Sequence, residues 1–132
     1  MDRRLLILQQ LQNEAEAIQR RILETEILLS EYNKTLETLQ YFSSSQQVVE
    51  ALMDLGGGVF AYVDVKNVKR FLVNVGAGVV VEKGVEDAIE FVKKRIGRVE
   101  ETREKLIAAL QQVVQQASKI QEEIEKEREE KK

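Results

Sequence analysis

Two glycine-rich triplets are the segments of this chain whose residue types and spacing most resemble a functional motif. They are Gly56-Gly57-Gly58 and Gly76-Ala77-Gly78. Glycine-rich loops bind phosphate when the turn leads directly into a helix and a Lys or Asp partner stands at a fixed spacing. Here each triplet leads into β-branched and aromatic residues, and no Gly-Lys-Ser/Thr sequence follows. The pattern therefore favours a tight hairpin turn that needs positive φ over a phosphate-binding loop.

The composition leaves little room for other site chemistry. The 132 residues include no His and no Cys, which excludes disulfides, thiolate and imidazole metal sites, and every catalytic triad that needs either residue. A net charge of −3 and only 5% aromatic residues argue against nucleic-acid binding. The many Glu residues fall on solvated helix faces with no sign of a concave pocket. We therefore expect no enzyme activity and no metal or other cofactor.

The elements that hold the triplets are predicted from a seven-residue apolar period on either side of them. The first arm runs from about Asp2 to Gln47, and the period over five heptads is a strong coiled-coil signal. Its seam consists of Leu8, Ala15, Ile22, Leu29 and Leu36 at positions a, with Leu11, Ile18, Thr25, Tyr32 and Leu39 at positions d.

The last arm, from Val85 to about Glu130, repeats this pattern, and only Arg103 interrupts its seam. Arg103 is either tolerated because its side chain reaches out to solvent, which we favour, or it serves to set the register. Arms of equal length predict an antiparallel helical hairpin in which Ala15 and Ala117 lie at similar depth. The seam consists of Ile89, Ile96, Arg103, Leu110, Ala117 and Ile124 at a, with Val85, Val92, Val99, Leu106, Val113 and Ile120 at d.

Between the arms, an internal repeat at an offset of 20 residues (Gly56 against Gly76) predicts two β-hairpins, with strands near 51–55, 59–65, 70–75 and 79–83. A single hairpin is marginally stable in water, and open apolar edges invite pairing with other chains. We therefore expect obligate oligomerisation through this insert. The strand residues assigned to it are Val59, Phe60, Val63, Val65, Phe71, Val73, Val75, Val79 and Val81.

Three segments resemble the alpha class of the prefoldin family: Leu55-Gly56-Gly57-Gly58-Val59-Phe60, Val73-Asn74-Val75-Gly76-Ala77-Gly78-Val79-Val80-Val81-Glu82-Lys83, and the helix start Glu86-Asp87-Ala88-Ile89-Glu90-Phe91-Val92-Lys93-Lys94-Arg95-Ile96. Paired hairpins distinguish the alpha class from the beta class, which has one. Asp54 departs from the family, which often has proline there, and we expect it to change the edge of the first strand only.

The resemblance implies an α+β fold: a long antiparallel two-helix coiled coil joined by two β-hairpins that assemble into an intersubunit β-barrel. It implies a single domain over residues 1–132, with an N-terminal helix at 1–48, paired hairpins at 49–84 and a C-terminal helix at 85–132. The implied particle is a hexamer of two alpha-type and four beta-type subunits. The implied function is that of an ATP-independent holdase, which captures non-native proteins at the coiled-coil tips and delivers them to a group II chaperonin. The resemblance also favours an archaeal source.

The sequence offers its own indication of where capture would occur. In the run Leu5-Leu6-Ile7-Leu8 only Leu8 belongs to the seam, so this free helix end has more apolar side chains than pairing needs. The alternative is a frayed last turn that folds over Ile120 and Ile124. The charged tail, Glu122 to Lys132, is typical of a solvated helix face, and steering of a charged partner is the alternative. The predicted client-binding residues are Leu5, Leu6, Ile7, Leu8, Leu11, Ile120 and Ile124.

A structural scaffold or filament-forming protein is the competing hypothesis, since the same insert could build an open assembly. Fixed-size particles would support the chaperone, and fibres of uneven length would support the scaffold. No stretch is apolar enough for a transmembrane helix, and the run at residues 5–8 is too short for a signal peptide. We therefore expect a cytoplasmic protein that contacts neither membrane nor nucleic acid.

Overall fold

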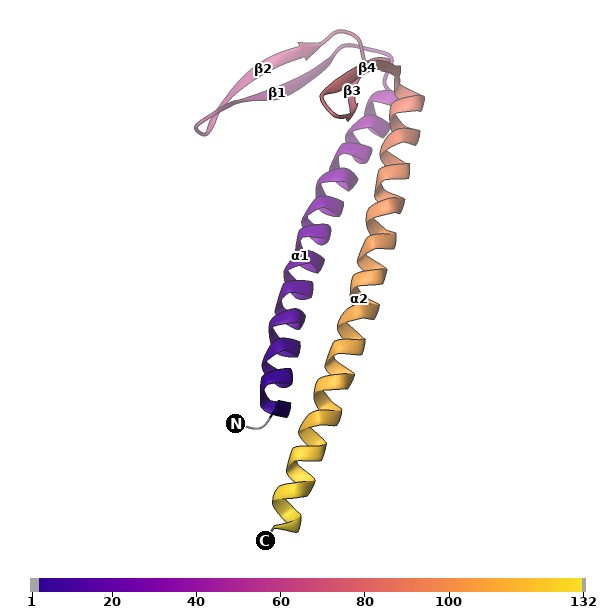
Figure 1. Cartoon of the computed structure of the whole chain (residues 1–132). Coiled ribbons are helices and arrows are strands. Elements are labelled where there is room, and N and C mark those ends of the chain that lie inside the picture. The colour runs from indigo at the N-terminus through magenta and orange to yellow at the C-terminus, as the bar shows by residue number, and fades with distance from the viewer. Residues whose placement is uncertain (1–2, 132) are drawn as a thin grey trace. The chain divides into compact units, whose positions relative to one another are not determined.

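The computed structural model describes residues 3–131 (Figure 1). Along the chain, one long helix precedes two β-hairpins and a second long helix follows them. This confirms the predicted α+β class with paired hairpins. The outermost predicted positions, residues 1–2 and 132, lie outside the described residues. The elements are α1 (Arg3–Ser44), β1 (Val49–Gly56), β2 (Val59–Val65), β3 (Arg70–Gly76), β4 (Val79–Gly84) and α2 (Val85–Glu130).

Helix α1 ends at Ser44, before the limit of residue 48 predicted for the N-terminal helix. Three consecutive serines, Ser43 to Ser45, account for the difference, because their hydroxyl groups compete with the helical hydrogen bonds. The Ser44 hydroxyl donates to the Tyr41 carbonyl at 3.0 Å, and the Ser45 amide donates to the Phe42 carbonyl at 3.2 Å. The last turn of the helix is thus closed locally, and the chain continues through residues 45–48 to β1.

Both hairpins have the turn that the triplets predict. Strand β1 pairs antiparallel with β2, and β3 with β4, each with an irregular register next to its turn. Positive φ angles at Gly57 (62°) and Gly58 (81°) match a two-residue turn of the kind that suits the twist of a hairpin. The second turn has the same conformation at Ala77 (51°) and Gly78 (76°). The two halves of the repeat are therefore locally equivalent.

The chain divides into two compact units. In the coil unit, which comprises residues 3–29 and 98–131 of the described chain, α1 and α2 run antiparallel, since Arg4 pairs with Glu127 and Glu26 pairs with Arg103. Apolar seam residues from both helices form its core, as the heptads predict. The buried members are Leu11, Ile18, Leu106 and Val113.

The hairpin unit, Ser30–Gly97, has a core of its own, in which Leu39 of α1 packs with the first turns of α2. The Phe42 and Phe71 rings lie 5.4 Å apart between centroids, and this contact brings β3 onto the helices. Helix α2 begins where the Val85 amide donates to the Lys69 carbonyl at 2.8 Å. The acidic Glu86 and Asp87 in its first turn suit the positive end of the helix dipole. The buried members of this core are Leu39, Val85, Ala88, Ile89 and Val92.

Candidate functional site

The side chains of residues 3–131 form no cluster of three or more His, Cys, Asp or Glu that could hold a metal ion. Within this range no polar or charged residue is buried. Catalytic groups are normally found where burial changes their chemistry. Among the described residues, the candidate functional sites are therefore the exposed apolar surfaces.

The first such surface is the beginning of α1. Leu5, Leu6 and Ile7 are all exposed, and Leu6 leaves 53% of its surface accessible. Leu8 is half-buried, and Leu11 is buried in the seam. The heptad frame predicted this division, because Leu8 and Leu11 are seam positions and Leu6, at position f, points away from the partner helix. We call Leu5, Leu6 and Ile7 the leucine end.

On α2, the predicted residues Ile120 and Ile124 are half-buried. Ile120 packs against the core of the coil unit, and Ile124 lines a shallow hollow together with Arg4 and Leu5. Within the charged tail, Glu127 accepts a hydrogen bond from Arg4 across the two helices. The structure thus brings Leu5 and Ile124 together, whereas Leu11 contributes to pairing and offers little surface.

The second exposed surface is the β1–β2 hairpin. Leu52 and Tyr62 are cross-strand partners, and Phe60 lies next along the same face, opposite Asp54. All three apolar side chains are exposed, and Tyr62 leaves 79% of its surface accessible. The opposite face contains Met53, which is also exposed. A two-stranded ribbon that is apolar on both faces is not stable in water without a partner.

Two of the predicted assembly residues pack within their own unit, which the sequence did not indicate. Phe71 and Val73 of β3 are half-buried and pack against the core of their own unit. Val59, Phe60, Val75, Val79 and Val81 are exposed, and Val63 and Val65 are half-buried. Leu72 and Val80, which belong to the apolar pattern of the strands, are exposed as well. Sequence reasoning passed over four further exposed strand residues, namely Leu52, Met53, Leu55 and Tyr62.

Arg95 is a second feature that sequence reasoning missed. Its guanidinium donates to the Asn74 carbonyl of β3 at 2.9 Å and lies 4.4 Å from the centroid of the Phe91 ring. Lys83 of β4 approaches the same ring at 5.8 Å. The Arg95–Asn74 hydrogen bond and the Lys83–Phe91 contact therefore join the β3–β4 hairpin to α2, whereas the Arg95–Phe91 contact lies within α2. No sequence period predicts a bond between a helix side chain and a strand carbonyl.

Arg103, the residue that interrupts the second seam, is half-buried. Its Nη2 and Nε donate to Oε1 of Glu26 at 3.0 and 3.3 Å. The arginine therefore pairs at the edge of the seam, an arrangement that fits both tolerance and a role in setting the register. The pair also joins the two helices of the coil unit at one depth.

No helix among the described residues has the length and apolar character that crossing a membrane requires.

Comparison with known proteins connects these features to one family. The family model described as "Prefoldin subunit" matches residues 11–130. The chain is 63% identical over 117 residues to "Prefoldin subunit alpha" from Archaeoglobus fulgidus, with 89% of this chain and 85% of that protein covered. It is 30% identical to "Prefoldin subunit alpha" from Thermofilum pendens, with 81% and 83% covered. Among solved structures, filamentous PFD from Methanocaldococcus jannaschii has a similar fold, with a TM-score of 0.75, 16% identity, and 89% and 97% of the two chains covered.

Proposed function

Because the chain belongs to the prefoldin family, a family of chaperones rather than enzymes, we propose that it is an alpha-type subunit of a holdase that captures non-native proteins without ATP. Capture takes place at the ends of the helices near the chain termini, and captured proteins pass to a group II chaperonin. In this proposal residues 1–132 act as one domain in the cytoplasm.

The observation that carries the proposal is the exposed leucine end. Leu5, Leu6 and Ile7 project from a helix whose pairing is already satisfied by Leu8 and Leu11. Burying each of these side chains in a client contributes up to about 1.5–3 kcal/mol before ordering costs. This surface is extended by the accessible parts of three half-buried residues, Leu8, Ile120 and Ile124. Leu11 is buried and joins the surface only when the two helices separate.

Several weak sites on one particle raise the avidity for a client without tight individual contacts. The exposed β1–β2 hairpin would drive the assembly of such a particle, because its apolar faces need a partner chain. We propose that the hairpins join those of beta-type prefoldin subunits in an intersubunit β-barrel. The resulting particle is a hexamer of two alpha and four beta subunits.

The test replaces Leu5, Leu6 and Ile7 by Ser in the assembled complex and measures suppression of aggregation of a denatured client. We expect a loss of at least severalfold, because the apolar area available to the client is removed while seam residues remain. The matched control is Leu23→Ser with Ile27→Ser, since these residues of α1 are at least as exposed as the leucine end, at 57% and 55%, and lie elsewhere on the helix.

An unchanged aggregation yield in the leucine-end variant, or an equal loss in the control, would contradict the proposal. Light scattering before the assay separates a loss of capture from a loss of assembly. The chain is measured alone and with a beta-type subunit, and a discrete mixed particle of constant mass is the expected result.

A structural scaffold is the second candidate function, and one observation favours it. The similar structure from Methanocaldococcus jannaschii is described as filamentous. In a scaffold the β1–β2 faces would add subunits without closing a ring. Mass that grows with concentration from this chain alone would support that function over the closed chaperone particle.

A further inference from the structure

A cavity of about 320 Å³ lies within the hairpin unit, where β3 meets α1 and α2. The buried side chains of Leu39, Ala88 and Val92 form its base. Phe71 and Val73 of β3 are half-buried and form one wall. Pockets that bind small molecules measure roughly 300–1,000 Å³ and have mostly apolar linings. The cavity therefore has the size and character of a site for a ligand at the small end of this range.

The charge of this cavity comes from Arg95 of α2, which is the one charged residue in its lining. The guanidinium lies 4.4 Å from the centroid of the Phe91 ring, and its Nη2 donates to the Asn74 carbonyl at 2.9 Å. These two contacts orient the group, and it forms no ion pair with any described residue. A guanidinium has further N–H donors, whose geometry matches a carboxylate. Arg95 is thus an oriented cation with donors available to an anion.

Tyr32 of α1 adds a neutral donor to the same cavity. Its side chain is half-buried against the core of the hairpin unit, and its hydroxyl forms no hydrogen bond with any described residue. The Thr35 hydroxyl, at the exposed rim, already donates to the Glu31 carbonyl at 3.1 Å. No acidic side chain lines the cavity. The polar groups that face the cavity therefore favour a ligand that accepts hydrogen bonds and has negative charge.

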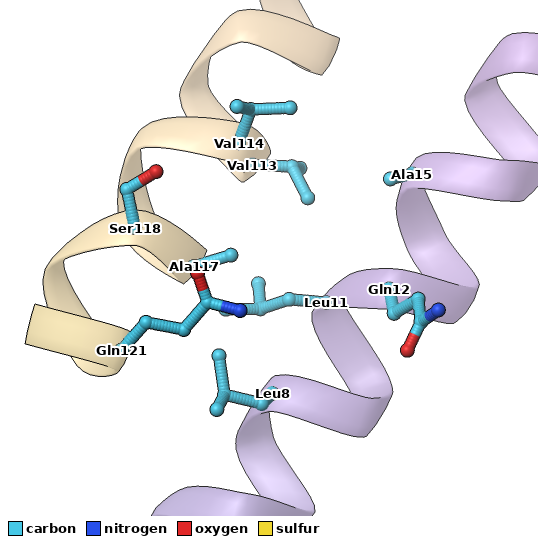
Figure 2. Close-up of a pocket in the computed structure, with 9 residues that line it drawn as sticks. All are labelled: Leu8, Leu11, Gln12, Ala15, Val113, Val114, Ala117, Ser118 and Gln121. Carbon is cyan, nitrogen blue, oxygen red and sulfur yellow. The ribbon is translucent and has the colours of Figure 1, made fainter. Parts of the chain in front are cut away.

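The coil unit has a groove of similar volume, about 310 Å³, between α1 and α2 (Figure 2). Figure 2 shows that apolar side chains such as Leu8, Leu11 and Val113 line it together with neutral polar ones such as Gln121. No charged residue belongs to this lining. A carboxylate placed there would lose solvation with no cation to offset the loss. The groove is therefore an internal control for the effect of ligand charge.

We propose that the cavity of the hairpin unit binds a small amphipathic monocarboxylate. Its carboxylate accepts hydrogen bonds from Arg95 and Tyr32, and its hydrocarbon body lies against Leu39, Phe71 and Val92. Such a ligand contacts α1, β3 and α2 together, so its binding stabilises the attachment of the β3–β4 hairpin to the helices. The inference goes beyond the proposed holdase function, because the cavity belongs to the hairpin unit and the leucine end belongs to the coil unit.

The test adds sodium octanoate to the full-length chain and follows the amide signals by two-dimensional NMR. We expect saturable shifts at the residues that line the cavity and none at the residues that line the groove of Figure 2. Octanamide has nearly the same shape without the charge, and the octylammonium ion has the opposite charge. Both should bind at least about fivefold more weakly, because the charge-assisted hydrogen bond is lost. At equal concentration, octanoate should raise the urea midpoint more than octanamide does.

Two variants test the two polar groups separately. Tyr32→Phe should weaken octanoate binding about threefold and leave the urea midpoint without ligand unchanged, because only an unpaired hydroxyl is removed. Tyr41→Phe is its matched control, since Tyr41 is exposed on α1 and does not line the cavity. Arg95→Gln should make octanoate and octanamide bind equally, which loss of a purely structural contact would not do. Arg98→Gln should retain the preference for octanoate, since Arg98 is exposed on α2 outside the lining.

Equal affinities for octanoate and octanamide in the parent chain would overturn the inference, as would shifts confined to the exposed face around Leu52 and Tyr62. Equilibrium dialysis of octanoate against the mixed particle with a beta-type subunit completes the test. Unchanged affinity would support the site, whereas loss of binding on assembly would overturn it, because a neighbouring subunit would then occupy the cavity. Suppression of aggregation is measured separately, so failure of this inference and failure of the proposed function are distinguishable.

Discussion

The two hairpins have nearly the same local structure but different surroundings. Both have antiparallel strands and a two-residue turn with positive φ. In both, an Asp or Asn side chain accepts a hydrogen bond from the backbone amide two residues later. Asp54 accepts from Gly56 at 2.7 Å, and Asn74 accepts from Gly76 at 3.0 Å. Yet only β3–β4 contributes residues to the core of the hairpin unit. No residue of β1–β2 belongs to that core in the described chain.

The difference can be traced to one position of the internal repeat. Phe71 packs against Phe42, and its counterpart at the offset of 20 residues is Ala51. The aromatic side chain supplies the contact area that holds β3 on the helices, and a methyl group at the equivalent place in β1 cannot. A duplicated hairpin thus gives one copy that is anchored in its own chain and one that is left for a partner.

Breaking the free hairpin should have the largest effect on assembly. We expect that Leu52→Ser, Phe60→Ser and Tyr62→Ser together abolish the mixed particle with a beta-type subunit, because they remove the exposed apolar face. The free energy of unfolding of the isolated chain should change by less than about 0.5 kcal/mol, since exposed positions contribute little. Light scattering and urea titration measure the two quantities. An intact particle would show that this face is not an interface.

Phe71→Ala gives the β3–β4 hairpin the same small residue that β1 has at Ala51, and so removes its aromatic anchor. Burial of Phe71 is partial, so we expect a loss of about 2 kcal/mol, below the roughly 3–5 kcal/mol of a fully buried Phe. Urea titration gives the loss, and hydrogen exchange should report weaker protection of β3 and β4. Leu72→Ala is the control, because Leu72 is the neighbouring residue and is 75% exposed. Equal effects of the two substitutions would contradict the role of Phe71 as the anchor.

Arg95→Met tests the polar part of the same anchor. The substitution removes the bond to the Asn74 carbonyl and the contact with the Phe91 ring, and we expect a loss of about 1 kcal/mol. Arg95→Lys should retain part of this stability, because a cation can still approach the ring. The urea midpoints of the three chains would be compared. An Arg95→Met chain as stable as the parent would show that the Arg95 contacts contribute nothing to the anchor.

The turns provide the smallest test of the comparison. Ala77 has φ at 51°, a region in which residues with a Cβ are strained, whereas Gly57 at the equivalent place has φ at 62° without that strain. Ala77→Gly should therefore stabilise the chain slightly, and Gly57→Ala should destabilise it, each by no more than about 1 kcal/mol. Opposite signs in urea titration are the expected result, and equal signs would mean that the two turns are not equivalent.

Much of the fold could be predicted because its signals are local. The seam residues, from Leu8 to Leu39 and from Val85 to Ile124, follow a period that any helical pairing must use. The glycine triplets and their β-branched neighbours specified the strands to within one or two residues. The exposed leucine end also followed from heptad positions alone. The extra length predicted for the first helix was wrong because serine hydroxyl groups closed its last turn.

The tertiary structure alone decided what depends on contacts between distant residues. The repeat shows that Phe71 and Ala51 differ, but it does not indicate that Phe71 packs inside its own chain while Phe60 stays exposed, because the partner of Phe71 is Phe42, far away in the sequence. The bond from Arg95 to Asn74 and the pairing of Arg103 with Glu26 likewise depend on which helix turn comes to lie beside which partner. Periodicity in one sequence determines which residues face a partner, whereas the identity of that partner is a property of the packed chain.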